Sequence, residues 1–110
     1  DIATLFLDND LNVRRFTDQI TRIVNLRESD VGRPLTDLAS TLNYPDLDAD
    51  ARQTLKSLAF SEKEITTTDG HWYMVRIKPY RTLADLIQGV VITLIDITAA
   101  KELESRLRKG

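Results

Sequence analysis

The sequence predicts an α+β domain with strands at both ends of the chain and helices between them. Near both ends, apolar residues alternate with polar ones or form short continuous runs, whereas in residues 18–58 they recur at intervals of three and four. An Asp69-Gly70 pair between two alternating segments is the strongest short-range signal of a β-hairpin. The 110 residues are enough for one compact domain and not for two.

The first two strands are expected to form a hairpin. Ala3 to Leu7 is a short apolar run closed by Asp8-Asn9-Asp10, a cluster suited to a tight turn. Residues 13–16 then resume as a second strand. The adjacent Arg14 and Arg15 on this strand are interpreted as a solvated edge and not as a binding patch.

The next segment is predicted to be a short helix that lies on the sheet. The period changes at residue 18, where Thr17 or Asp18 can cap the helix. Three apolar side chains share its buried face: Ile20, Ile23 and Val24. The spacing therefore predicts one amphipathic helix directly after the hairpin.

Two further helical segments complete the middle of the chain. Leu35, Leu38 and Leu42 allow a turn or two before Tyr44-Pro45 ends the pattern. A longer helix can start at Asp46 or Asp48. Its buried stripe is expected to contain Leu47, Ala51, Leu55 and Leu58.

The last three strands follow residue 62, where apolar residues begin to alternate with polar ones. Residues 65–68 and 71–80 form the predicted hairpin around Asp69-Gly70. One face of its second strand carries Tyr73, Val75, Ile77 and Pro79, and the other carries Trp72, Met74, Arg76 and Lys78. The first set is expected to face the core, because the second set carries two charges. Residues 82–88 are expected to be a loop, and Gly89 to Ile97 a strand that is apolar on both faces.

A charged helix over Thr98 to Lys109 is predicted to follow this strand without a break. Its apolar stripe has coiled-coil spacing and consists of Ala100, Leu103 and Leu107. Two acidic-to-basic pairs follow at i,i+4, Glu102 with Arg106 and Glu104 with Arg108. About two heptads are too short to be stable alone, so the helix suits the start of a two-chain coiled coil. The alternative is an amphipathic tail that docks on its own domain.

The end of the last strand carries Asp96-Ile97-Thr98, then two residues and Lys101. This DITAAK sequence, in register with DGHWY and GVVITLIDIT, resembles the terminal motif of PAS domains. The resemblance covers the chain from Ala3 to Lys101. The segments VGRPLTDL and WYMVRIKPYRT further resemble the PAS domains of bacterial multidomain signalling proteins. Those proteins include fusions with chemoreceptor methyltransferase or methylesterase modules, and sensor kinases.

The resemblance implies a five-stranded antiparallel sheet with short helices on one face, a cavity between sheet and helices, and a C-terminal signalling helix. Residues 1–98 would be the PAS domain and residues 99–110 the start of the connector helix. Such domains sense small molecules or redox state, or act as dimerising connectors, and they transmit through the helix after the motif. Asp96, Thr98 and Lys101 would form the signal junction, in which either Asp96 or Thr98 can cap the helix and Asp96 can pair with Lys101.

The candidate ligand pocket is apolar and is expected to be lined by Ile23, Leu55, Leu58, Tyr73, Val75 and Ile77. The alternative is that these side chains simply fill the core. Tyr73 is the most ligand-like of them, because a buried hydroxyl needs a partner.

No cofactor is expected. Haem-binding relatives use a histidine on the crossover helices, and residues 18–60 contain none. Light-sensing flavin relatives use a cysteine, and the sequence has none. Flavin held without a covalent bond, or another small ligand, stays open.

The residues for catalysis or metal binding do not form a recognisable set, so the domain is not expected to be an enzyme, although the parent protein can be one. His71 is the single histidine, it follows a turn glycine, and no serine lies in a nucleophile-elbow pattern. Asp46, Asp48 and Asp50 have the spacing of a calcium loop, but the required glycine and glutamate are missing. These carboxylates suit helix capping and a solvated face instead.

Partners are expected among proteins. A net charge of -2 gives no basic surface for nucleic acid, and no apolar run approaches the roughly 20 residues of a membrane span. The chain begins with Asp1 and stops inside a helical pattern, so we expect a piece of a longer cytoplasmic protein with its own downstream effector domain. A homodimer is expected, with contacts to a second chain or a flanking helix through Trp72, Met74, Leu103 and Leu107.

Two hypotheses of function follow: a module that dimerises and transmits a signal through the helix after Thr98, or a small-molecule sensor with an open apolar pocket. The first is favoured by the whole topology and the exit helix. The two differ in whether the cavity is open or filled.

Overall fold

The computed structural model describes residues 2–37 and 42–109. It contains a five-stranded antiparallel sheet in the order β2-β1-β5-β4-β3, so the predicted sheet is confirmed. Its strands are β1 (Ile2–Asp8), β2 (Val13–Phe16), β3 (Ser61–Thr66), β4 (Trp72–Arg81) and β5 (Ile87–Asp96). The last strand in the chain is therefore the central one, and the helical crossover joins the two edges of the sheet.

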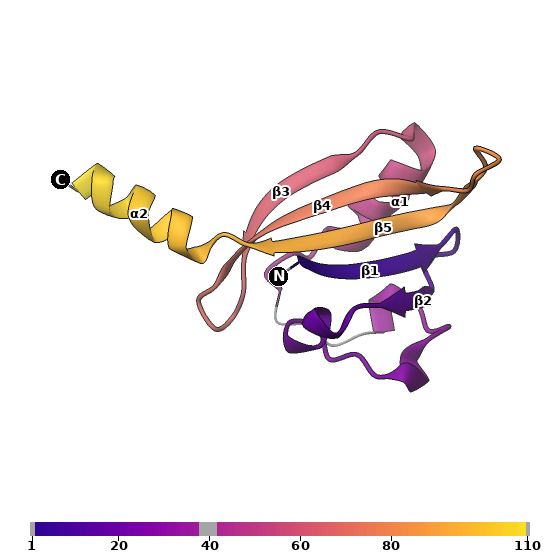
Figure 1. Cartoon of the computed structure of the whole chain (residues 1–110), viewed down its shortest axis with the longest axis horizontal. Coiled ribbons are helices and arrows are strands. Elements are labelled where there is room, and N and C mark those ends of the chain that lie inside the picture. Colours follow the sequence, from indigo (N-terminus) through magenta and orange to yellow (C-terminus); the bar gives the residue numbers. More distant parts are fainter. Residues whose placement is uncertain (1, 38–41, 110) are drawn as a thin grey trace.

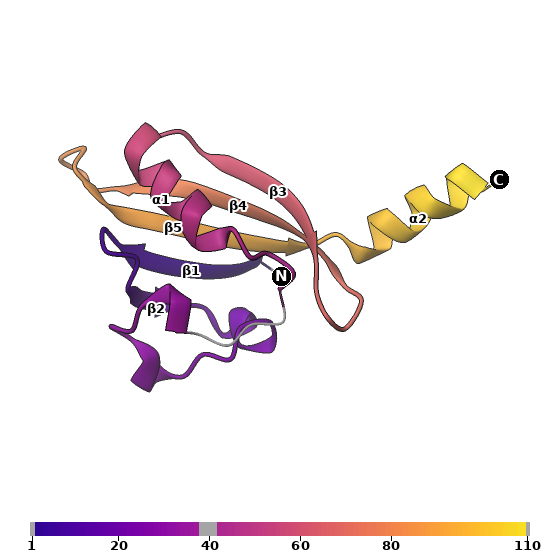
Figure 2. The same ribbon diagram turned by 180° about the vertical axis from the view of Figure 1, so that it is seen from behind.

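The helices between β2 and β3 gather on one face of this sheet. They are the 3-10 helices η1 (Asp18–Arg22), η2 (Glu28–Asp30) and η3 (Leu35–Asp37), and the α-helix α1 (Leu47–Ser57). A further helix, α2 (Thr98–Lys109), follows β5. Figure 1 shows the sheet with α1 behind it, and Figure 2 shows α1 in front. In both views α2 leaves the end of β5 and extends away from the sheet. Only the covered face can form a core with the helices of this chain.

The core lies between β5, its two neighbours and the helices. Val90, Ile92 and Leu94 of β5 are almost completely buried. Val75 and Ile77 pair with Leu94 and Ile92 in register and are buried with them, as the alternation in β4 predicted. The burial of these side chains contributes to the hydrophobic stabilisation of the sheet.

The opposite face of β5 is half-buried by neighbouring strands. Phe6 on β1 and Tyr80 on β4 meet edge to face, with ring centroids 5.5 Å apart. The guanidinium of Arg15 lies 4.2 Å from the centroid of the Phe6 ring. Arg15 belongs to the edge strand β2, as expected for the arginine pair. The apolar outer residues of the last strand are therefore partly covered by side chains alone.

Several predicted boundaries differ from the structure. The helix expected from residue 18 is 3-10, and the Thr17 hydroxyl accepts a bond from the Thr4 amide at 3.0 Å and does not cap the helix. β5 begins at Ile87 and not at the predicted Gly89. The loop before it is shorter than predicted, because the Thr82 amide donates to the Leu86 carbonyl at 2.9 Å.

The buried stripe of α1 is shorter than the sequence predicted. Ala51 is fully buried and Leu55 packs against the core, but Leu58 is 42% exposed, so its predicted burial is wrong. Leu58 has left the helix with a φ of 59° and ends it as a left-handed cap. In the earlier helical segment, Leu35 is buried in η3, whereas Leu38 lies outside the described residues.

Within residues 2–37 and 42–109, no helix is both long and apolar enough to cross a membrane.

Candidate functional site

The junction between β5 and α2 is the first part of the candidate site. The backbone N–H of Thr98 donates to Oδ1 of Asp96 at 2.9 Å, so the Asp96 side chain caps the first N–H of α2 from two residues before it. Oγ1 of Thr98 instead accepts a hydrogen bond from the backbone N–H of Trp72 at 2.9 Å. The backbone N–H of Ile97 donates to the carbonyl of Trp72, also at 2.9 Å. These bonds fix the start of the helix to the first residue of β4.

The electrostatics of the junction favour an ionised Asp96. Hydrogen bonds from Thr98 hold the pKa of the Asp96 carboxyl below its ordinary value, and the positive charge of a protonated His71 adds to the effect. Nδ1 of His71 lies 3.7 Å from Oδ2 of Asp96, and Nε2 lies 3.9 Å from Oδ2 of Asp69. The single histidine of the sequence therefore lies in the loop before β4, between two carboxylates.

Lys101 links α2 to the far strands of the sheet. Its Nζ lies 2.5 Å from Oε1 of Glu64 on β3 and 3.6 Å from Oε2 of Glu104 on α2. The same ammonium lies 5.0 Å from the centroid of the Trp72 ring, within reach of a cation–π interaction. The predicted pairing of Lys101 with Asp96 is wrong, because the lysine side chain extends over β4 toward β3. Glu64, its actual partner, was missed.

An apolar cavity lies between the sheet and the helices that cover it. Its volume is about 260 Å³. Its apolar lining includes Leu5, Ile20, Val24, Leu35, Leu42 and Ile92. Tyr44 also lines the cavity, and its hydroxyl donates to the carboxylate of Asp50. Burial and this carboxylate raise the pKa of Tyr44, so the hydroxyl stays protonated at neutral pH.

None of the six predicted pocket residues lines this apolar cavity. Val75 and Ile77 are packed in the core, and Leu55 lies against it, half-buried. Leu58 is exposed. Ile23 and Tyr73 do lie together, but they line a second cavity of about 320 Å³ beside the junction, where the surroundings are more polar. The predicted pocket residues therefore belong mostly to the core, and the prediction missed the residues that line the apolar cavity.

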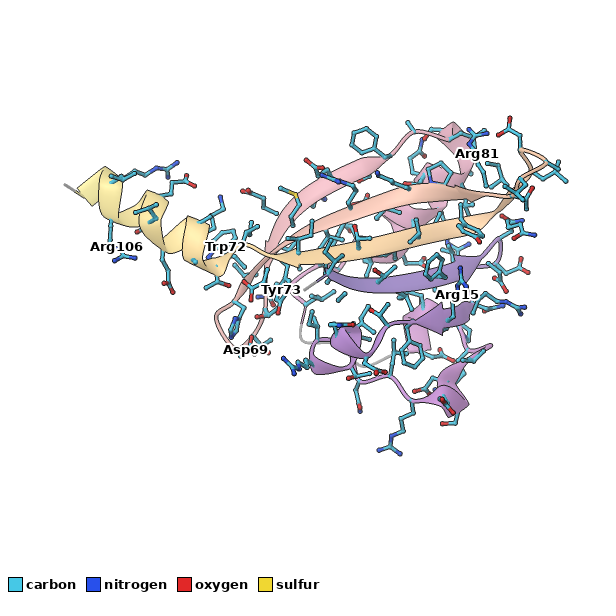
Figure 3. All side chains as sticks on the ribbon, viewed as in Figure 1. Arg15, Asp69, Trp72, Tyr73, Arg81 and Arg106 are labelled. Carbon is cyan, nitrogen blue, oxygen red and sulfur yellow. The ribbon has the colours of Figure 1, made fainter. Side chains whose placement is uncertain are left out.

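The predicted contact residues Trp72 and Met74 alternate along β4 with the buried Val75 and Ile77, so they lie on the open face of the sheet. Figure 3 shows Trp72 at the end from which α2 leaves. In register across three strands, Ile2 is paired with Ile95, and Ile95 with Met74. We call the four side chains Ile2, Trp72, Met74 and Ile95 the junction patch. Ile2 is 52% exposed and the other three are half-buried. No helix in the described part of the chain crosses this face (Figure 1).

The outer half of α2 has no partner in the described residues. Leu103 and Leu107 are 55% and 74% exposed. Arg108 pairs with Glu104 at 2.7 Å as predicted, but no ion pair joins Glu102 to Arg106 in the described residues. Beyond Lys101, no hydrogen bond or ion pair joins α2 to the sheet in that same part of the structure. The helix thus presents an apolar stripe to its surroundings.

Solved structures share this fold. The PAS domain of histidine kinase ThkA matches with a TM-score of 0.73 and 21% sequence identity, over 86% of this chain and 98% of that one. A sensory box sensor histidine kinase from Vibrio cholerae matches with a TM-score of 0.69 and 14% identity, over 89% and 83%. VqmA of Vibrio cholerae matches with a TM-score of 0.74 and 14% identity, over 91% of this chain and 48% of VqmA.

The sequence itself matches more specifically. It is 40% identical over 103 residues to the "Uncharacterized 104.1 kDa protein in hypE 3'region" of Rhodobacter capsulatus. The matched segment is 94% of this chain and 11% of that relative, so the chain spans about a tenth of the relative's length. A family model described as PAS domain matches residues 1–98, which contain the whole sheet and end at the first residue of α2. The chain therefore belongs to the PAS domain family.

Proposed function

We propose that this PAS domain is a sensory, signal-transmitting module that forms a homodimer and passes its state through α2 to an effector domain of the same polypeptide. The observation that carries the proposal is the continuity of β5 and α2 around Asp96 and Thr98. The central strand of the core runs into a helix whose apolar stripe has no partner within the described chain. A displacement in the core would therefore reach α2 through the hydrogen bonds to Trp72.

The similar proteins support a modular role. The matched relative has a mass of 104.1 kDa, far more than one such domain. The two similar kinase structures carry names in which a PAS domain or sensory box belongs to a histidine kinase. VqmA is described as a dimer and as a protein that binds DNA. We propose that the present domain likewise acts on another module, in the cytoplasm, by binding and relay and without catalysis of its own.

We propose that two surfaces form the dimer. The first is the stripe of Leu103 and Leu107, because a helix of this length gains stability mainly by packing against a second one. The second is the junction patch, which lies at the base of the same helix. Apolar side chains that adjoin in this way suit one continuous interface between two copies.

Light scattering over a concentration series tests the proposal. The chain of residues 1–110 is expected to dimerise, and a version that ends after Thr98 is expected to dimerise more weakly or not at all. If both versions have the mass of a monomer at every concentration, dimerisation through α2 is wrong for this domain.

Charged variants separate the two surfaces. Leu103→Lys with Leu107→Lys removes the helical stripe, and Met74→Lys places a charge in the junction patch opposite Glu64, with which it can pair. Leu86→Lys is the matched control, because Leu86 is 65% exposed and lies in the β4–β5 loop at the other end of the sheet. If the proposal holds, the first two variants self-associate more weakly than the unchanged protein, and the control self-associates as strongly. Unchanged self-association in Met74→Lys would remove the junction patch from the interface.

A second candidate function is that of a small-molecule sensor, and the apolar cavity of about 260 Å³ is the observation that favours it. This volume lies just below the usual range of about 300–1,000 Å³ for ligand pockets, so only a small apolar molecule would fit. Indole is a suitable probe, and it is expected to raise the unfolding temperature. A filled variant, Val24→Phe, is expected to lose the response. An equal response in both proteins would place the probe elsewhere.

A further inference from the structure

We propose that the polar cavity beside the junction binds a small zwitterionic molecule of the amino-acid class, with its carboxylate at Arg22 and its ammonium group between Asp18 and Asp96. The inference rests on the proposed sensory function and specifies the chemistry of the signal. It concerns the second cavity, which is separate from the apolar cavity under α1 except that Leu94 touches both.

The polar groups come from three separate parts of the chain. Asp18, Gln19 and Arg22 belong to η1, Tyr73 to β4, and Asp96 to the end of β5. Ala3, Ile23 and Leu94 add an apolar surface to the same cavity. Figure 3 shows Tyr73 at the end of the sheet from which α2 leaves. The volume of about 320 Å³ has room for about ten water molecules, which is enough for a free amino acid.

The polar side chains of η1 are not used by the fold. Within the described residues, the side chains of Asp18, Gln19 and Arg22 make no hydrogen bond or ion pair. Asp18 and Arg22 lie four positions apart in a 3-10 helix, where residues three apart share a face, and within the described residues no ion pair joins them. All three residues are exposed, so their polar groups are hydrated, and a ligand would displace water from them without breaking a bond within the protein.

Positive and negative charges both affect the pKa of the Tyr73 hydroxyl. Burial raises the pKa of Tyr73, the carboxylates of Asp96 and Asp69 raise it further, and the guanidinium of Arg22 lowers it. The Tyr73 hydroxyl is thus a neutral donor at physiological pH, with a cation and anions around it. A purely anionic ligand would meet the repulsion of the aspartates, and a purely cationic one that of Arg22. A zwitterion can satisfy both, and Arg22 can hold its carboxylate in two parallel bonds.

Asp96 connects this cavity to the output helix. Its Oδ1 already accepts the hydrogen bond that starts α2, and its Oδ2 lies 3.7 Å from His71. A ligand ammonium group at Oδ2 would place a positive charge beside the carboxylate whose other oxygen accepts the Thr98 N–H, and so would weaken that oxygen as an acceptor. Binding would therefore change the one carboxylate that both lines the cavity and holds the helix.

Titration calorimetry and thermal unfolding with free L-amino acids, each tested singly with the chain of residues 1–110, examine the inference. At least one amino acid is expected to bind and to raise the unfolding temperature. Its decarboxylated amine and its 2-hydroxy acid, each of which lacks one charge, are expected to bind about tenfold or more weakly. Nuclear magnetic resonance is expected to show shifts of the Asp96 and Thr98 amide signals on binding.

Two variants test the assigned roles. Arg22→Gln and Asp18→Asn are each expected to weaken binding by about tenfold or more. Arg106→Gln is the matched control, because this arginine lies on α2 away from the sheet (Figure 3), and it is expected to bind as the unchanged protein does.

Absence of binding by every amino acid at about 10 mM, which corresponds to a free energy weaker than about -3 kcal/mol, would overturn the inference. Binding that is equal in Arg22→Gln, Asp18→Asn and the control would also overturn it, because the ligand would then lie elsewhere. The light-scattering experiment is independent of these results. A dimer that binds no amino acid refutes the ligand assignment alone, whereas a monomer that binds one refutes the dimeric output and leaves the site in place.

Discussion

Oγ1 of Thr98, the first residue of α2, accepts a hydrogen bond from the backbone N–H of Trp72, the first residue of β4, at 2.9 Å. Because the carbonyl of Trp72 also accepts a bond from the Ile97 amide, both backbone polar groups of this residue are bonded to the junction. The exit helix is thus attached to two adjacent strands and not only to the strand that precedes it. A change in the angle of α2 must break or bend these bonds.

Removal of this acceptor is expected to loosen the junction. Thr98→Val keeps the shape of the side chain but leaves the Trp72 amide without its partner, so the free energy of unfolding should fall by about 1 kcal/mol. Chemical denaturation measures the loss, and hydrogen exchange at the Trp72 amide should become faster. Thr98→Ser keeps the hydroxyl and should behave like the unchanged protein. Equal loss in both variants would show that the methyl group, and not the hydrogen bond, stabilises the junction.

The cap at Asp96 predicts a pH dependence of stability. The pKa of this carboxyl is lowered in the folded protein, chiefly by the hydrogen bonds from Thr98, whereas in the unfolded chain it is near 3.8. The ionised cap therefore stabilises the fold above pH 3.8, and this contribution is lost as the pH falls below that value toward the folded pKa. Denaturation at a series of pH values should show a weaker decline for Asp96→Asn than for the unchanged protein. Parallel pH profiles would contradict the assignment.

Glu64 and Lys101 provide a test through charge reversal. Trp72 is the single tryptophan of the sequence, and the Lys101 ammonium lies over its ring, so its fluorescence reports on this contact. Glu64→Lys should repel Lys101 and change the emission spectrum. The double variant Glu64→Lys, Lys101→Glu restores opposite charges between β3 and α2 but removes the cation from the ring. By circular dichroism, the helicity of α2 is expected to fall in Glu64→Lys and to recover in the double variant, while the emission stays altered. Failure of the helicity to recover would contradict an ionic attachment of α2.

Most of the fold could be predicted because the spacing of apolar residues along the sequence indicates directly whether a segment is a helix or a strand. The alternation from Trp72 to Tyr80 correctly assigned Val75 and Ile77 to the core, and the helix after the DIT motif was predicted with its observed bounds. Leu58 shows the limit of this reasoning. Helical spacing extended the buried stripe of α1 to Leu58, but spacing does not show where the backbone turns into a left-handed conformation and ends the helix.

The site could be predicted only in part, because its contacts join distant segments. The motif correctly marked Asp96 and Thr98 at the junction, where the structure separates their roles as cap and acceptor. Nothing local in the sequence pairs Lys101 with Glu64, since the contact depends on how β3 lies beside β4. The lining of both cavities likewise depends on where η1 and α1 rest on the sheet.

Gly89 provides the final prediction, which tests the packing of the central strand. It is paired with Asp8 on β1 and with Tyr80 on β4, and it has a φ of 152°. A Cβ atom at this position would lie 1.8 Å from the carbonyl oxygen of Leu7, a backbone atom that cannot move aside without displacement of β1.

Gly89→Ala is therefore expected to lower the free energy of unfolding by about 3 kcal/mol or more in urea denaturation. Gly70→Ala is the matched control, because Gly70 has a φ of 87° and nothing lies within 4 Å of the added carbon. The control should lose only about 1 kcal/mol, the cost of a left-handed backbone with a side chain. If the two variants lose the same amount, backbone conformation alone explains the effect. The close approach of β1 to β5 would then not constrain this position.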